Sequence, residues 1–135
     1  MADERLRRRE RLRLRREFLR VYRDGARIRR QCLMLHARPN GLGYDRLGLA
    51  VGRKVGPAVT RNRTKRRLRE LFRRNKRGLA GGSDIVVTAL AGAGDSDFWT
   101  LRSQFLEGLE ELERRLLAAR SPRARPLPSS GSTRS

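Results

Sequence analysis

The chain of 135 residues has little of what builds disulfide frameworks or metal centres. Cys32 is its only cysteine and His36 its only histidine, which excludes a disulfide framework, a cysteine-cluster zinc site and a histidine-rich metal site. No apolar run approaches the ~20 residues that span a bilayer, and the first residues, charged from Asp3 onward, do not resemble a secretory signal. These absences predict a cytoplasmic protein with no membrane segment.

Negative charge is also scarce, with 14 Asp and Glu against 34 Lys and Arg, so that the net charge is +20. The imbalance lies in residues 1–77, which hold 27 cationic and 7 acidic side chains, whereas residues 78–135 hold seven of each. The length fits one small domain. A basic half joined to a neutral half predicts that residues 1–77 bind a nucleic acid or another polyanion.

Known catalytic patterns are missing as well. The stretch 52–57 contains glycines but lacks the residue order of a phosphate-binding loop. His36 has no carboxylate or serine pattern near it in the sequence, so it lacks the partner that a catalytic base needs. A cation-rich chain without an acid–base pair favours a protein that assists an RNA catalyst.

The stretch 57–76 has the strongest pattern in the sequence and is predicted to be a helix. Pro57 stands where this helix would begin, and Gly78 lies just past its end. A narrow stripe at helical spacing should face the core: Thr64, Leu68, Leu71, Phe72 and Asn75. The other faces carry cations with Glu70 as the only counter-ion, and like charges four residues apart repel by about 0.2–0.5 kcal/mol per pair. A polyanion that supplies the missing negative charge explains this helix better than a solvated surface does.

Hydrophobic periodicity predicts further helices at 15–24 and 97–119, and strands at 31–37, 46–52 and 84–90. The last two strands flank the central helix in a βαβ unit, so they should be parallel. Helix 97–119 has glutamates on its outer faces and should turn away from nucleic acid. Residues 1–10 are expected to be a flexible basic arm, 11–119 a single RNA-binding domain, and 120–135 a disordered tail.

Two aromatic residues of the first helix, Phe18 and Tyr22, lie one turn apart on one face. They are either core residues or stacking platforms beside a basic groove, in a chain with only 5% aromatic residues. His36, alone on a strand, is most simply a packed or edge residue.

The segment Lys54-Val-Gly-Pro-Ala-Val-Thr-Arg-Asn-Arg-Thr-Lys-Arg-Arg-Leu-Arg-Glu70 resembles the signature of the bacterial ribonuclease P protein component. The order of elements from about Arg11 to about Leu117 fits as well. The resemblance implies an α+β fold, a two-layer sandwich of about four strands and three helices similar to the second domain of ribosomal protein S five. It also implies a left-handed βαβ crossover, whereas the general rule favours a right-handed one.

The resemblance further implies that a catalytic RNA, holding the Mg²⁺, removes the 5′ leader of precursor tRNA while the protein, inactive alone, assists. One monomer per RNA is expected. The residues expected to bind the catalytic RNA are Arg53, Lys54, Arg61, Asn62, Arg63, Lys65, Arg66 and Arg69; those expected to bind the leader are Phe18, Tyr22 and His36, the last where relatives often have tyrosine. The alternatives are a ribosomal protein or RNA chaperone without a nuclease and, less well matched, a DNA-binding protein.

Overall fold

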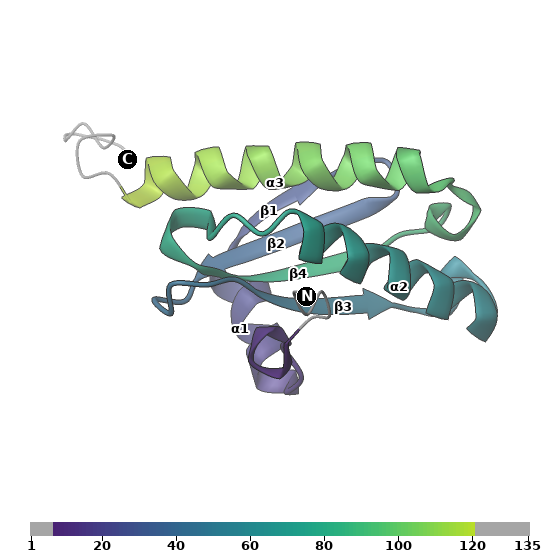
Figure 1. Cartoon of the computed structure of the whole chain (residues 1–135), viewed down its shortest axis with the longest axis horizontal. Helices are drawn as coiled ribbons and strands as arrows, with labels where there is room; N and C mark the ends of the chain where they lie inside the picture. Colours follow the sequence, from purple (N-terminus) through teal and green to yellow (C-terminus); the bar gives the residue numbers. More distant parts are fainter. Residues whose placement is uncertain (1–6, 121–135) are drawn as a thin grey trace, which may run out of the picture.

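The computed structural model describes residues 7–120, so most of the expected arm (1–10) and nearly all of the expected tail (120–135) lie outside the described residues. One mixed sheet forms the centre, with strand order β1-β2-β4-β3 (Figure 1). Its strands are β1 (Ala26–Arg29), β2 (Leu33–Pro39), β3 (Arg46–Val51) and β4 (Ser83–Ala89). β1 and β4 both pair antiparallel with β2, whereas β3 pairs parallel with β4, as the βαβ pattern predicts.

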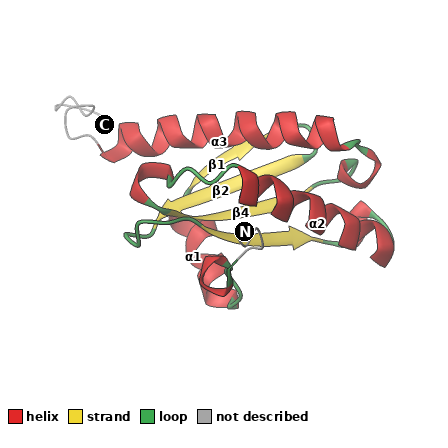
Figure 2. Ribbon diagram, in the orientation of Figure 1, coloured by secondary structure: helices red, strands yellow, loops and turns green. Residues whose placement is uncertain are grey.

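Three helices cover this sheet: α1 (Arg15–Asp24), α2 (Ala58–Arg74) and α3 (Phe98–Arg120). α2 and α3 pack on one face and enclose the main core, which includes Leu68 and Phe72 of α2 and Phe105 and Leu109 of α3. The short α1 crosses the other face and forms a smaller apolar cluster there (Figure 2). The expected α+β fold of four strands and three helices is confirmed; α1 adds a partial layer beyond the two-layer sandwich. The handedness of the crossover stays a prediction.

β4 explains why the sheet is the centre of the fold. Its residues 83–87 and 89 are buried, because helices lie over both faces of this strand. Ile85 and Val87 join the core under α2 and α3, whereas Val86 packs under α1. A β-branched run is typical of such a doubly covered strand. Within residues 7–120, no helix is long and apolar enough to cross a membrane.

The central helix follows its predicted pattern closely. Thr64, Leu68, Leu71 and Phe72 are buried, and Pro57 is the N-cap, so the helix starts one residue later than expected. Asn75 ends it, with its side-chain amide donating to the Leu71 carbonyl oxygen at 2.8 Å. The buried stripe is narrow, which leaves most of the α2 circumference free to present charge.

Candidate nucleic-acid interface

The outer face of α2 is a surface of uncompensated positive charge. Its single carboxylate, Glu70, is engaged by the guanidinium groups of Arg73 and Arg74. Asn62 and Arg66 are exposed at the middle of this face and have no carboxylate partner on the helix. Just before α2, a single 3₁₀ turn (η2, Arg53–Val55) exposes Arg53 and Lys54. A basic surface of this kind attracts phosphates over the range of the Debye length.

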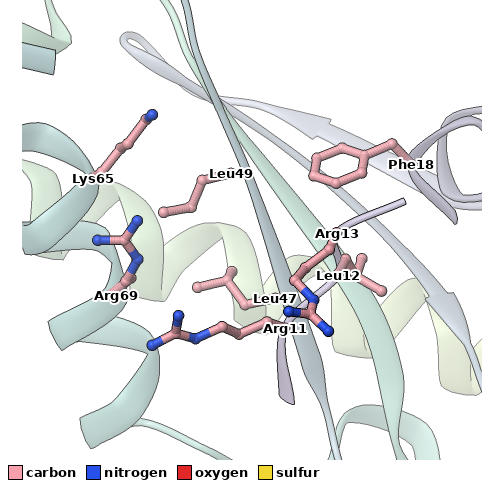
Figure 3. Close-up of a pocket in the computed structure, with 8 residues that line it drawn as sticks. All are labelled: Arg11, Leu12, Arg13, Phe18, Leu47, Leu49, Lys65 and Arg69. Atoms are coloured by element: carbon pink, nitrogen blue, oxygen red, sulfur yellow. The ribbon is translucent and has the colours of Figure 1, made fainter. Parts of the chain in front are cut away.

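The cations on the two flanks of α2 face different neighbours. On one flank, Lys65 and Arg69 point toward the edge of β3 (Figure 3). On the other flank, Arg63 donates to the Gly94 carbonyl oxygen at 3.0 Å and Arg67 to that of Ser96 at 3.0 Å. These two arginines therefore stabilise the turn before α3 as well as contributing positive charge to the surface.

A groove runs along the edge of β3, between α1 and α2. Its floor is apolar and its rim basic (Figure 3), and it is lined by Arg11, Leu12, Arg13, Phe18, Leu47, Leu49, Lys65 and Arg69. The chain before α1 closes the first half of this edge, because the Leu12 N–H donates to the Leu47 carbonyl oxygen at 2.8 Å. Burial lowers the pKa of Arg69, and the nearby charges of Arg11 and Arg66 lower it further.

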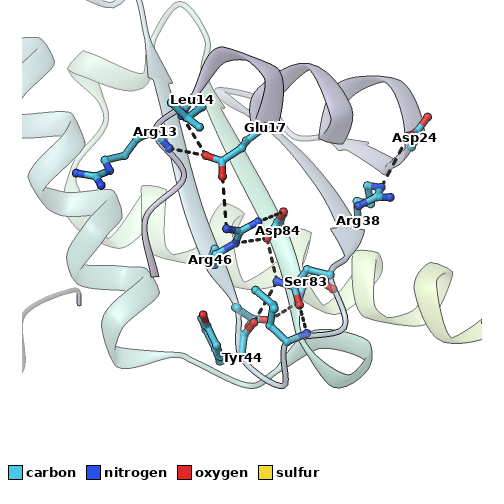
Figure 4. Close-up of polar contacts among 12 residues, drawn as sticks. Arg13, Leu14, Glu17, Asp24, Arg38, Tyr44, Arg46, Ser83 and Asp84 are labelled. Carbon is cyan, nitrogen blue, oxygen red and sulfur yellow. Dashed lines mark hydrogen bonds and ion pairs between the residues drawn. The ribbon is translucent and has the colours of Figure 1, made fainter. Parts of the chain in front are cut away.

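Ion pairs fix α1 across the sheet on the side away from its aromatic residues. Arg46 of β3 lies 2.7 Å from the buried Asp84 carboxylate and 3.5 Å from Glu17 of α1 (Figure 4). Burial acts to raise the pKa of Glu17, but backbone N–H donors at Leu14 and Arg13 and the Arg46 charge together hold it below its usual value. At the other end of α1, Asp24 lies 3.8 Å from Arg38.

The aromatic residues of α1 lie on its opposite side. Phe18 is half-buried and packs directly on the backbone of β3, where a Cβ on Gly48 would lie 2.7 Å from its ring. Tyr22 is 38% exposed, and its ring meets that of His36 edge-on at 4.8 Å. Phe18 thus serves partly as a core residue and partly as a wall of the groove, whereas Tyr22 does not line the groove and leaves more of its surface exposed.

An uncovered strip of sheet lies beside these aromatics. Gly48, Val86 and His36 are neighbours in register and lie under α1. Residues two positions farther along the strands point to the same face. They are Ala50, Thr88 and Met34, which are also neighbours in register and are each half-buried. We call this strip, with its wall of Phe18 and Tyr22, the trough.

His36 lies beneath Tyr22 and is only 8% exposed. Burial lowers its pKa, and the nearby Arg27 charge lowers it further, so the imidazole is neutral at pH 7. Its Nδ1 atom is buried and has no hydrogen-bond partner among the described residues. His36 therefore supports the Tyr22 ring from below and offers little surface of its own to a ligand.

Comparisons with known proteins decide between the candidate families. A family model described as Ribonuclease P matches residues 6–113. The ribonuclease P protein component of Thermotoga maritima is 44% identical over 110 residues, covering 78% of this chain and 94% of that protein. The solved T. maritima structure has a TM-score of 0.67 at 42% identity, covering 78% of this chain and 96% of that one. A Staphylococcus aureus structure has a TM-score of 0.66 at 28% identity, covering 79% and 94%.

The chain belongs to the ribonuclease P protein family. This confirms the resemblance carried by the segment 54–70, and it favours a ribonuclease P subunit over the ribosomal-protein and chaperone alternatives. The relative from Caldanaerobacter subterraneus agrees, at 38% identity over 96 residues, which cover 71% of this chain and 79% of that protein.

For this ribonuclease P protein, the structure brings the predicted site residues together in two groups. The eight expected RNA-binding residues all lie on η2 and α2, of which Arg61 and Lys65 are half-buried and the rest exposed. Phe18, Tyr22 and His36 lie together on the opposite face of the sheet. Sequence analysis did not single out Arg11 and Arg13 on the groove rim, nor Ala50, Thr88 and Met34 on the trough floor. The strand alternation identifies the floor once the α1-covered face is known.

The described part of this family member, residues 7–120, contains no group of three or more His, Cys, Asp or Glu side chains placed to hold a metal ion. The expectation that Mg²⁺ is held mainly by an RNA partner stays a prediction.

Proposed function

We propose that this chain assists a catalytic RNA in the endonucleolytic removal of the 5′ leader from precursor tRNA, binding that RNA through η2 and α2 and the leader through the trough. The RNA performs the hydrolysis with its bound Mg²⁺, and the protein alone is inactive. The protein acts in the cytoplasm as a monomer, one per RNA. Family membership supports the ribonucleoprotein, and the trough beside a basic groove is the observation that supports leader binding.

The contact with the catalytic RNA rests on charge. Arg53, Lys54, Asn62 and Arg66 are exposed on η2 and α2, and the one carboxylate of α2, Glu70, is already paired with Arg73 and Arg74. A folded RNA brings phosphates close together, and cations between them reduce the repulsion and release counterions on binding. Arginine adds planar, bidentate hydrogen bonds to phosphate oxygens.

The leader site rests on shape and ring chemistry. A single strand has unstacked bases, which stack on aromatic rings and on flat apolar surfaces. Its phosphates are attracted to nearby cations. The trough provides the Phe18 and Tyr22 rings beside a floor formed by Ala50, Thr88 and Met34. Lys65 and Arg69, whose expected ligand is the catalytic RNA, line the adjoining groove and so also bring positive charge close to the leader phosphates (Figure 3).

The test compares three RNAs with the same protein variants. Tyr22→Ala and Phe18→Ala should weaken binding of precursor tRNA with a leader about tenfold or more, because stacking contributes about 1–3 kcal/mol per base. Binding of mature tRNA and of the catalytic RNA should stay unchanged. Tyr22→Ala is the cleaner variant, since Phe18 also packs on Leu12, Val21 and Val86.

Melting temperatures measured alongside distinguish leader contact from core packing. If alanine at Tyr22 lowers the melting temperature strongly and weakens all three RNAs in proportion, the leader is bound elsewhere. Cleavage of precursor tRNA by RNA-free protein would refute the assignment of catalysis to the RNA.

A further inference from the structure

Trp99 is the only tryptophan of the chain and is 68% exposed. It is the second residue of α3, and the Arg102 guanidinium lies 5.9 Å from the centre of its ring system. The Phe98 ring meets it edge-on at 5.3 Å. Large rings left in water are typical of interaction sites, since stacking or burial on a partner recovers their apolar surface.

The position of Trp99 links it to the basic surface of α2. Phe98 lines a surface cavity together with Arg63, Arg66, Arg67 and Glu70. Because the Trp99 ring contacts the Phe98 ring, Trp99 lies close to this cluster of three arginines. Arg63 and Arg67 hold the turn before α3 by hydrogen bonds to backbone carbonyl groups. The start of α3 is therefore fixed against α2, and the two helices lie along the same face of the sheet (Figure 1).

The charges along α3 also differ between its start, which lies near the α2 arginines, and its second half. Residues 98–106 contain Arg102 and no carboxylate, whereas four glutamates follow between Glu107 and Glu113. Of the two carboxylates that precede the helix, Asp95 is exposed, and Asp97 accepts the Thr100 backbone N–H at 2.7 Å. The second half of α3 carries the negative charge on which the expectation that α3 turns away from nucleic acid was based. The first turns of α3 do not carry it.

We propose that Trp99 stacks on an unpaired base of the catalytic RNA, with Arg102 and Arg66 on the adjoining phosphates. The RNA interface then continues from α2 onto the start of α3. An exposed ring among arginines is the arrangement that binds splayed-out RNA bases, and the positive surroundings favour RNA over a protein partner. The leader is excluded as the ligand, because the trough proposed to bind it lies beside α1, on the face of the sheet opposite α2 and α3. This inference rests on the proposed function.

The first measurement uses Trp99 emission, which reports on this residue alone because the chain has no other tryptophan. Acrylamide, a neutral quencher, should quench the free protein efficiently and should quench its complex with the catalytic RNA several-fold less. A leader oligonucleotide alone should leave quenching unchanged. Equal quenching with and without the catalytic RNA would overturn the proposal.

The second measurement is the affinity for the catalytic RNA. Trp99→Ala should weaken binding by roughly 5- to 100-fold, the equivalent of about 1–3 kcal/mol for one stacked base, and Trp99→Phe should retain most of it. Leu117→Ala, which also removes an exposed apolar side chain from α3 (48% exposed) but near its acidic half, serves as the control and should bind as wild type. Melting temperatures should be unchanged in all three.

The outcomes separate this inference from the proposed function. If Trp99→Ala binds like wild type while Arg66→Ala is weakened, the stacking site is wrong and the α2 interface stands. If neither variant loses affinity for the catalytic RNA, the proposed α2 interface is wrong, and the proposed stacking site is refuted together with it.

Discussion

Replacing Gly48 by alanine tests how the fold positions Phe18, which we propose to be part of the leader-binding site. Gly48 lies in β3 directly under α1, and an added Cβ would meet the Phe18 ring at 2.7 and 2.9 Å and the Leu12 Cβ at 3.2 Å. Contacts below 3.0 Å are too close for carbon atoms, so the ring must move. Because Phe18 is half-buried, we expect it to tilt away from β3 and into the trough.

The expected cost follows from two opposing effects. Overpacking of this kind costs about 1–3 kcal/mol, and replacing glycine by alanine returns about 0.4–1 kcal/mol by restricting the unfolded chain. Subtracting one range from the other gives a net destabilisation of about 0–2.6 kcal/mol. The midpoint, about 1.3 kcal/mol, corresponds to a fall of roughly 4–6 °C in melting temperature for a domain of this size. The displaced ring should also narrow the trough and weaken leader binding by several-fold.

Gly52→Ala provides a matched control at the far end of the same segment, since its Cβ would meet nothing within 4 Å. It should melt at or slightly above the wild-type temperature and discriminate normally between precursor and mature tRNA. The readouts are thermal melting and the ratio of the two tRNA affinities, with catalytic-RNA affinity expected to be unchanged. If Gly48→Ala matches Gly52→Ala in both readouts, Phe18 does not depend on β3 for its position and the reasoning fails.

Three further outcomes are expected. Arg66→Ala removes an exposed cation and should flatten the dependence of log K on log [salt] for the catalytic RNA by about 0.7–0.9 per lost phosphate contact; an unchanged slope would place Arg66 off the interface. His36 has its pKa lowered by burial and by Arg27, so stability present above pH 6.5 should be lost as pH falls through the folded-state pKa. His36→Phe should remove this loss from melting curves recorded at successively lower pH, starting above pH 6.5, and an equal loss in both proteins would contradict the reasoning. Arg46→Ala leaves the buried Asp84 carboxylate without its ion pair and should cost about 3–5 kcal/mol in chemical denaturation, a cost that Asp84→Asn in the same chain should reduce.

The sequence predicted α2 and the β3–α2–β4 unit well because their patterns are local. The stripe from Thr64 to Phe72 repeats at helical spacing, and β4 is a β-branched run. β1 was not located, since its four residues, Ala-Arg-Ile-Arg, contain a single fully buried side chain, Ile28. An edge strand that buries so little apolar surface has no pattern that distinguishes it from a loop; its pairing with β2 defines it.

Site geometry was harder to predict, because it depends on contacts between distant segments. The sequence indicated which α2 residues are cationic, but not that Lys65 and Arg69 flank the β3 edge while Arg63 and Arg67 hold the turn before α3. For α3, counting charges over the whole helix concealed the difference between its first turns and its acidic second half.

The arrangement around β3 explains how the two surfaces proposed to bind RNA, which lie on opposite faces of one sheet, could act on one substrate complex. β3 is the last strand of the sheet, with Gly48 and Ala50 on the α1 face and Leu47 and Leu49 on the α2 face. Backbone pairing with Leu12 closes the first half of its edge. A leader in the trough therefore has only the second half of one thin strand between its bases and the cations of α2. Small residues on the α1 face keep that separation short, and larger side chains at Gly48 or Ala50 would lengthen it.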